Sequence, residues 1–264
     1  MAAAASAVVL LSRAPAARAA AARVVSLELQ LTEILISLGA PPVAAADNAL
    51  YRRLVAEPAL PATVSDLGPL QQPNLEFLQY LAPDLIILPA WQGGPLRATL
   101  ARVATVAVIG DLSPKPPLER LEADVRKLAE AVDRRAQAEA LLAAADETFD
   151  RARGSMSSQP TFLCRFFEDG RHLAMIGSKS VVGSVAERVG VTNARHERQS
   201  AFGLGVAAIE DLAAVPDARI LHFHRGAETE RALRRLERSP LWRALPAVRK
   251  GEVFATPVVH PNGG

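Results

Sequence analysis

This 264-residue sequence has little cysteine and little net charge. Its single cysteine, Cys164, excludes an internal disulfide and any metal site built from several thiolates. Cys164 lies in the mostly apolar run 162–167, which is typical of a buried strand. The formal net charge is only +2, and the 30 basic residues are spread along the chain rather than clustered. We therefore expect no nucleic-acid partner, because such partners require a basic patch.

Long apolar runs are also missing after the first 22 residues. Residues 1–22 are rich in Ala, Val and Leu and contain small residues after Arg18, as export signals do. No basic residue precedes the apolar stretch, which leaves open a start further upstream or a segment that is Ala-rich for another reason. No other segment approaches the roughly 20 apolar residues that cross a bilayer.

Common catalytic motifs are absent as well. The sequence contains no Gly-x-Ser-x-Gly, Walker loop, Gly-x-Gly-x-x-Gly or His-Glu-x-x-His. Residues 177–180, Gly-Ser-Lys-Ser, lack the leading glycine of a phosphate loop, and we interpret them as a strand-to-helix turn capped by Ser178 or Ser180. An α/β enzyme therefore remains only a remote alternative.

What the sequence does contain is a repeated order of patterns. Strand-like residues 24–27 precede a helical run at 32–38, and strand-like residues 174–177 precede a helical run at 178–188. A helical run and a Pro-Asp strand then follow in each half, at 75–88 and at 209–221. Two matching halves predict two α/β lobes with a ligand-binding cleft between them.

A helical stretch separates the two halves. Apolar residues recur at three- and four-residue steps from Leu118 to Val132, which predicts an amphipathic helix. Residues 134–153 are rich in Ala, Leu, Glu and Arg and predict a second helix, about 30 Å long. A helix of that length is long enough to join the lobes as a strut.

Motifs in order along the chain resemble a known family. In the first half they are 23–28, 38–43, Ala46-Asp47, Tyr51-Arg52, Glu57-Pro58, Leu60-Pro61, 66–68, 72–76 and 100–102; in the second half they are Arg171-His172, Asn193-Ala194, 211–214 and 239–249. Together they are similar to the periplasmic iron(III)-hydroxamate (ferrichrome-type) siderophore-binding proteins. The resemblance runs from about residue 23 to residue 264.

The resemblance implies a class III periplasmic binding protein, with two α/β lobes joined by a single long helix. It divides the chain into an export signal (1–22), an N-terminal lobe (23–133), a linker helix (134–155) and a C-terminal lobe (156–264). It implies a monomer that is not an enzyme, which captures a ferric siderophore and delivers it to an inner-membrane ABC importer. Iron enters only within the siderophore, with no other cofactor. The family continues with a further helix after residue 264, so we expect the sequence to be truncated.

The resemblance also implies ligand-contacting positions, few of which keep the family's residue type. The family's hydroxamate-binding Arg falls on Leu70 and its Tyr donor on Gln92, directly after Trp91. Its cleft Trp residues fall on Leu54, Arg195 and Phe202, and its last aromatic pair falls on His260 and Asn262. We expect the second lobe to grip the ligand, or the ligand to differ from ferrichrome. Trp91 could instead be an ordinary loop aromatic, and the loop around Arg195 could be simply solvated.

Three questions stay open at this point. Glu76 and Glu210 hold equivalent positions in the two halves and could dock the permease, or they could be acids favoured in a first helical turn. His222 and His224 share one face of a strand, a spacing that metals use, but no further ligands are evident nearby. A carrier of cobalamin, haem or another metallophore on the same fold remains the closer alternative function.

Overall fold

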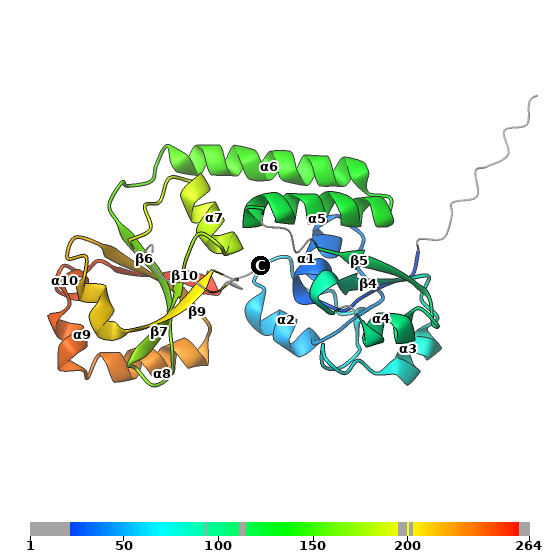
Figure 1. Cartoon of the computed structure of the whole chain (residues 1–264), viewed down its shortest axis with the longest axis horizontal. Helices are drawn as coiled ribbons and strands as arrows, with labels where there is room; N and C mark the ends of the chain where they lie inside the picture. Colours follow the sequence, from blue (N-terminus) through cyan, green and yellow to red (C-terminus); the bar gives the residue numbers. More distant parts are fainter. Residues whose placement is uncertain (1–21, 93, 111–114, 195–199, 201–202, 259–264) are drawn as a thin grey trace, which may run out of the picture.

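The structure is a computed structural model, and it describes residues 22–92, 94–110, 115–194, 200 and 203–258. Two α/β lobes lie side by side, and one long helix runs along the same side of both (Figure 1). Each lobe is built on a five-stranded sheet. None of the helices in the described part of the chain combines the length and the apolar character needed to cross a bilayer.

The first sheet is entirely parallel and has the order β3-β2-β1-β4-β5. Its register pairs Val25 of β1 with Ala44 of β2 on one side and with Ile86 of β4 on the other. After β1 the chain adds β2 and β3 on one side of the sheet, and after β4 it adds β5 on the other side. The strands are β1 (Val24–Ser26), β2 (Ala44–Ala45), β3 (Ser65–Asp66), β4 (Leu85–Pro89) and β5 (Thr105–Ile109).

Helices cover both faces of this sheet. Successive residues of β4 alternate between the two faces, so Ile86 and Leu88 join one apolar core and Ile87 joins the other. Tyr51 and Leu78 pack in the first of these cores, and Leu128 packs in the second. The helices are α1 (Leu29–Ser37), α2 (Asn48–Leu54), α3 (Leu75–Leu81), α4 (Pro95–Leu100) and α5 (Pro117–Ala131), with a 3₁₀ turn η1 (Ala90–Gln92).

The second sheet is mixed and has the order β10-β9-β6-β7-β8. Strands β9 and β10 run parallel to β6, whereas β7 is antiparallel to both β6 and β8. The strands are β6 (Thr161–Phe166), β7 (His172–Ile176), β8 (Leu204–Ala208), β9 (Arg219–His224) and β10 (Val253–Val258). The predicted strand at Cys164 is confirmed, since this residue is fully buried in β6 and burial raises the pKa of its thiol.

Two separate cores also flank the second sheet. Phe162 and Ile220 belong to the core under α8–α10, and Leu163 and Phe223 belong to the core under α7. The helices of this lobe are α7 (Val181–Arg188), α8 (Ala227–Leu236), α9 (Pro240–Ala244) and α10 (Pro246–Arg249), with a 3₁₀ turn η2 (Ile209–Ala213).

The helix α6 (Arg135–Arg153) spans both lobes along one side of the molecule (Figure 1). Its 19 residues make it about 28 Å long, which confirms the predicted helix. Ion pairs link it to both neighbours: Glu139 contacts Arg126 of α5 at 3.0 Å, and Asp150 contacts Arg188 of α7 at 2.9 Å. Because pairs of this exposure contribute little energy, we assign most of the contact energy to apolar packing, in which Ala138, Leu141 and Leu142 of α6 join the core with α1 and α5.

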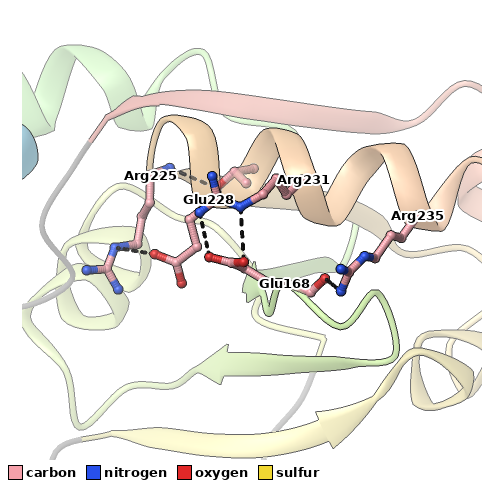
Figure 2. A network of polar contacts seen from close by, with 6 residues as sticks. Glu168, Arg225, Glu228, Arg231 and Arg235 are labelled. Carbon is pink, nitrogen blue, oxygen red and sulfur yellow. Dashed lines mark hydrogen bonds and ion pairs between the residues drawn. The ribbon is translucent and has the colours of Figure 1, made fainter.

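A polar network anchors the turn between β6 and β7 to α8 (Figure 2). The carboxylate of Glu168 accepts two hydrogen bonds from Arg231, at 2.7 and 3.0 Å, and the Glu168 carbonyl accepts one from Arg235 at 2.5 Å. Gly170 completes the turn with a φ of +65°, and a Cβ there would lie only 2.7 Å from the Cβ of Arg235. The turn can therefore approach α8 this closely only with glycine.

The repeated sequence pattern predicts the strands of the two lobes, but the matching strands take different positions in their sheets. In the first lobe, the repeated strands β1 and β4 are direct neighbours. Their counterparts in the second lobe, β7 and β9, are separated by β6, and β7 runs antiparallel to it. The two lobes thus share a local chain pattern, while their sheets differ in topology.

Candidate functional site

The first sheet has a topological switch point between β1 and β4. The chain leaves the carboxyl end of β1 toward α1 and that of β4 toward η1, and the next strands lie on opposite sides of this pair. Open α/β sheets bind ligands in the crevice that such a divergence creates at the carboxyl ends of the strands. The side chains that follow these two strands, Glu28 and Trp91, are therefore the first candidates for the site.

A pocket of about 210 Å³ lies at this switch point, and the second lobe supplies part of its lining. Glu28 and Trp91 line it from the first sheet, and Lys179 and Ser180, at the start of α7, line it from the other lobe. The indole of Trp91 is 57% exposed, so it offers an open aromatic wall. Arg120 and Asp124 of α5 add further charged groups of both signs to the lining.

Hydrogen bonds tie together the segments that follow β2, β3 and β4 of the first sheet. The carboxylate of Asp47, after β2, accepts a hydrogen bond from the backbone N–H of Leu70 at 3.2 Å, and the Leu70 carbonyl accepts one from Nε2 of Gln92 at 3.0 Å. The Oε1 atom of Gln92 is buried and has no hydrogen-bond donor in the described part of the chain. This part of the first lobe thus contains a buried acceptor without a donor among the described residues.

Glu28 caps helix α1 and also lines the pocket. Its Oε2 accepts a hydrogen bond from the backbone N–H of Leu31 at 2.9 Å, which caps the amino end of α1. Burial raises the pKa of Glu28, and the charge of Asp124 raises it further, while hydrogen bonds from the first turn of α1 oppose the change. The group is a partly buried acid near the carboxyl end of β1.

The turn that carries Lys179 is held by backbone packing and by a helix cap. Ser180 accepts a hydrogen bond from the N–H of Gly183 at 3.0 Å and donates one to the Gly177 carbonyl at 2.8 Å. This confirms the strand-to-helix turn that the sequence predicts and identifies Ser180 as its cap. Gly183 packs so closely on the turn that a Cβ would lie 2.0 Å from the Gly177 oxygen. Lys179 is thereby presented to the pocket from a rigid support.

The predicted ligand contacts divide into two groups. Trp91 and Gln92 lie at the strand ends just described, while Leu70 and Leu54 are buried, with 9% and 3% of their surface exposed. The remaining predicted positions lie outside the described residues: Arg195, Phe202, His260 and Asn262, together with the loop residues His196 and Arg198. The ligand-binding roles of all these residues stay predictions.

The two predicted docking acids are both on the surface. Glu76 lies in the first turn of α3 and Glu210 in the first turn of η2, and both are exposed. Neither forms an ion pair within the described residues. Their position suits both interpretations offered by the sequence, docking and helix-end electrostatics.

Each of the two histidines of β9 contacts neighbouring protein groups. His222 is 4% exposed, and its ring lies 5.1 Å from that of Phe166. Burial lowers the pKa of His222 to about 4, and His224 adds to this effect. Nδ1 of His224 accepts a hydrogen bond from the backbone N–H of Gly226 at 3.0 Å. Within the residues that the structure describes, no three His, Cys, Asp or Glu side chains gather as a metal ion requires.

The sequence argument did not identify Glu28 and Lys179 as pocket residues. Each lies two or three residues after the end of a strand, as Trp91 does, and that position was the available signal. A polar residue at a strand end has equal access to the crevice.

Comparisons with known proteins agree with this architecture. The family model described as periplasmic binding protein matches residues 24–259. The chain is 30% identical over 240 residues to the iron(3+)-hydroxamate-binding protein FhuD of Escherichia coli, covering 90% of this chain and 80% of that protein. It superimposes with a TM-score of 0.83 and 27% identity on the Fe3+-Desferal-bound siderophore-binding protein FhuD of Vibrio cholerae, covering 93% and 92% of the two chains. The Bacillus subtilis triscatecholate siderophore-binding protein FeuA, solved with ferri-bacillibactin, shares the fold at a TM-score of 0.69 and 13% identity, with coverage of 91% and 86%.

Proposed function

The chain belongs to the periplasmic binding protein family, and we propose that it captures a ferric siderophore of the hydroxamate type and delivers it to an inner-membrane ABC importer. The observation that carries this proposal is the match, over 93% of the chain, to a protein solved with Fe3+-Desferal. The sequence similarity to the E. coli iron(3+)-hydroxamate-binding protein also extends over 90% of the chain, so it includes both lobes.

The chemistry of a ferric hydroxamate suits the pocket at the switch point. The chelator already surrounds the iron with oxygen atoms, so the protein has to supply apolar walls and a few hydrogen-bonding groups rather than metal ligands. Trp91 supplies the wall, and Lys179 supplies a cationic donor from the opposite lobe.

The two tryptophans of the chain make a direct test possible. Trp91 is exposed at the pocket, whereas Trp242 is 6% exposed in the core of the second lobe. Ferric Desferal should quench the emission of the wild-type chain and of Trp242→Phe, with a Kd of about 1 μM or lower. The Trp91→Phe variant should lose most of the quenching, and calorimetry then measures how much affinity the indole contributes.

Other ligands tested in the same titration separate the alternatives. A ferric catecholate, haem and cobalamin should each bind at least about tenfold more weakly than ferric Desferal. Preference for haem or cobalamin would favour another carrier function on the same fold. If no ferric chelate produced heat or quenching with the full chain, the proposal would be wrong.

Delivery to the importer assigns a docking role to Glu76 and Glu210. Both carboxylates are exposed and available to basic groups of a permease. Alanine at either position should leave ferric Desferal affinity unchanged and lower uptake into vesicles that contain the cognate importer. Glu119→Ala, an exposed acid in the first turn of α5, is the matched control and should transport normally. Normal uptake by both docking variants would contradict this assignment.

The same proposal places the protein in the periplasm, after removal of residues 1–22 as an export signal. It divides the remaining chain at the ends of the long helix, into an N-terminal lobe (23–133), a linker (134–155) and a C-terminal lobe (156–264). The separate sheets built from 24–109 and 161–258 support this division. Mass spectrometry of the exported protein would test the cleavage site.

A further inference from the structure

A second, larger cavity of about 480 Å³ lies where both lobes meet α6. Its volume falls in the range of about 300–1,000 Å³ that is typical of small-molecule sites. Its walls are mainly aliphatic and aromatic and come from α1, α5, α6, α7 and β9. Representative wall residues are Ile34 of α1, Leu121 of α5, Leu142 and Phe149 of α6, Val185 of α7 and Phe223 of β9.

Three carboxylates interrupt this apolar lining, and two of them are paired. Glu122 lies 3.8 Å from Arg126, and Asp146 lies 3.6 Å from Arg188. The third, Glu33, has no ion pair within the described residues, and its Oε2 atom is buried without a hydrogen-bond donor. Glu33 is therefore the wall group whose bonding capacity is left unfilled.

The surroundings of Glu33 contain no compensating cation in the described structure. Burial raises the pKa of Glu33 to about 7, and the nearby charge of Glu28 contributes to the rise. An unsatisfied acceptor in an apolar setting is costly, and a charge-assisted hydrogen bond is the strongest way to satisfy it. The group that fits is a cation that donates hydrogen bonds.

We propose that this cavity binds an apolar primary amine, whose ammonium group donates a hydrogen bond to Glu33 while its hydrocarbon body packs against the aliphatic and aromatic walls. The inference rests on the joint presence of a large apolar cavity and one unpartnered carboxylate on its wall. It does not depend on siderophore binding. Because both lobes and α6 supply walls, an occupant contacts all three parts and stabilises their arrangement.

A set of three probes with one skeleton tests the proposal by calorimetry on the full chain at pH 8, where Glu33 is ionised. The amine 4-phenylbutylamine should bind with 1:1 stoichiometry and raise the melting temperature. The alcohol 4-phenylbutanol should bind at least about tenfold more weakly, because a neutral hydroxyl loses the charge-assisted bond. The acid 4-phenylbutanoate, which repels the carboxylate, should be the weakest.

Variants then assign the contact to one carboxylate. Glu33→Gln should weaken the amine by at least about tenfold and leave the affinity for the alcohol within about threefold. Glu122→Gln and Asp146→Asn remove wall acids that already have partners, so they are matched controls and should change amine affinity by less than about threefold. Val185→Trp fills the cavity and should abolish binding of the amine, with folding checked by circular dichroism.

Several results would overturn the proposal. They are absence of amine binding to the wild-type chain, equal affinity for the amine and the acid, and unchanged amine affinity in Glu33→Gln. Amine binding that survives in folded Val185→Trp would place the amine elsewhere and would overturn it as well. If Val185→Trp does not fold, the comparison of Glu33→Gln with the two control variants still decides the question.

Discussion

Replacing Gly183 by alanine should destabilise the second lobe, although alanine is the better helix former. An ideal Cβ at this position would lie 2.0 Å from the Gly177 oxygen and 2.5 Å from its carbonyl carbon. Such contacts fall far inside van der Waals distance, and both are with backbone atoms that cannot rotate away. The start of α7 or the turn before it therefore has to move.

The expected magnitude follows from three opposing effects. Overpacking of this kind costs about 1–3 kcal/mol, and weakening the Ser180 cap costs about 1 kcal/mol more. Alanine returns about 1 kcal/mol through its higher helix propensity. We therefore expect the free energy of unfolding to fall by about 1–3 kcal/mol. Because the same turn carries Lys179 into the pocket, ferric Desferal affinity should fall as well.

Urea unfolding followed by circular dichroism measures the change, with Gly154→Ala as the matched control. Gly154 ends α6 in a helical conformation, with φ −69° and ψ −16°, and a Cβ there would meet only the Arg151 oxygen at an ordinary 3.7 Å. Alanine at this position should be neutral or stabilising by up to about 1 kcal/mol. If Gly183→Ala were as stable as Gly154→Ala, the argument from close packing would be refuted.

Three further outcomes are expected. Burial raises the pKa of Glu33 to about 7 from 4.5, so between these values the folded chain binds a proton that the unfolded chain releases. The free energy of unfolding should therefore fall by up to about 3 kcal/mol between pH 4.5 and 8. Glu33→Gln should remove this loss in urea titrations at several pH values, and an unchanged pH profile in the variant would contradict the argument. Leu78 is fully buried in the first lobe, so Leu78→Ala should cost about 2–5 kcal/mol in the same assay, and a cost below about 1 kcal/mol would show that the core refills the space. Because α6 spans both lobes, ferric Desferal should close the cleft by only a few degrees, and a clear compaction in small-angle scattering would contradict this rigidity.

Helices were the part of the fold that the sequence predicted best. The period of apolar residues located α5, and a composition rich in helix formers located α6, each within a residue of its observed start. The two-residue strands β2 and β3 carried no comparable signal. A strand of two residues cannot display an alternation, and Ala44 and Ala45 resemble helix formers in isolation.

Sheet order was less accessible than element type. The repeated pattern predicted two lobes, but it did not reveal that β6 lies between β7 and β9. Backbone pairing of β6 with β9 joins residues more than 50 positions apart, such as Thr161 with Arg219. Local sequence determines whether a segment prefers to be a strand, whereas its neighbour depends on which apolar faces remain uncovered elsewhere in the chain.

The residues that line the candidate pocket and the cavity come from even more distant parts of the chain. Trp91 could be proposed from the sequence because ligands of α/β folds bind at the carboxyl ends of strands, and the structure leaves this residue open to solvent. Glu33 instead lies in the mostly apolar helix α1, and nothing in its local sequence marks it as part of a cavity wall. Val185 and Phe223, on the opposite wall of its cavity, come from the other lobe and lie more than 150 residues later. The pKa of this carboxyl and its lack of a partner are therefore properties of the packed lobes, which no local pattern encodes.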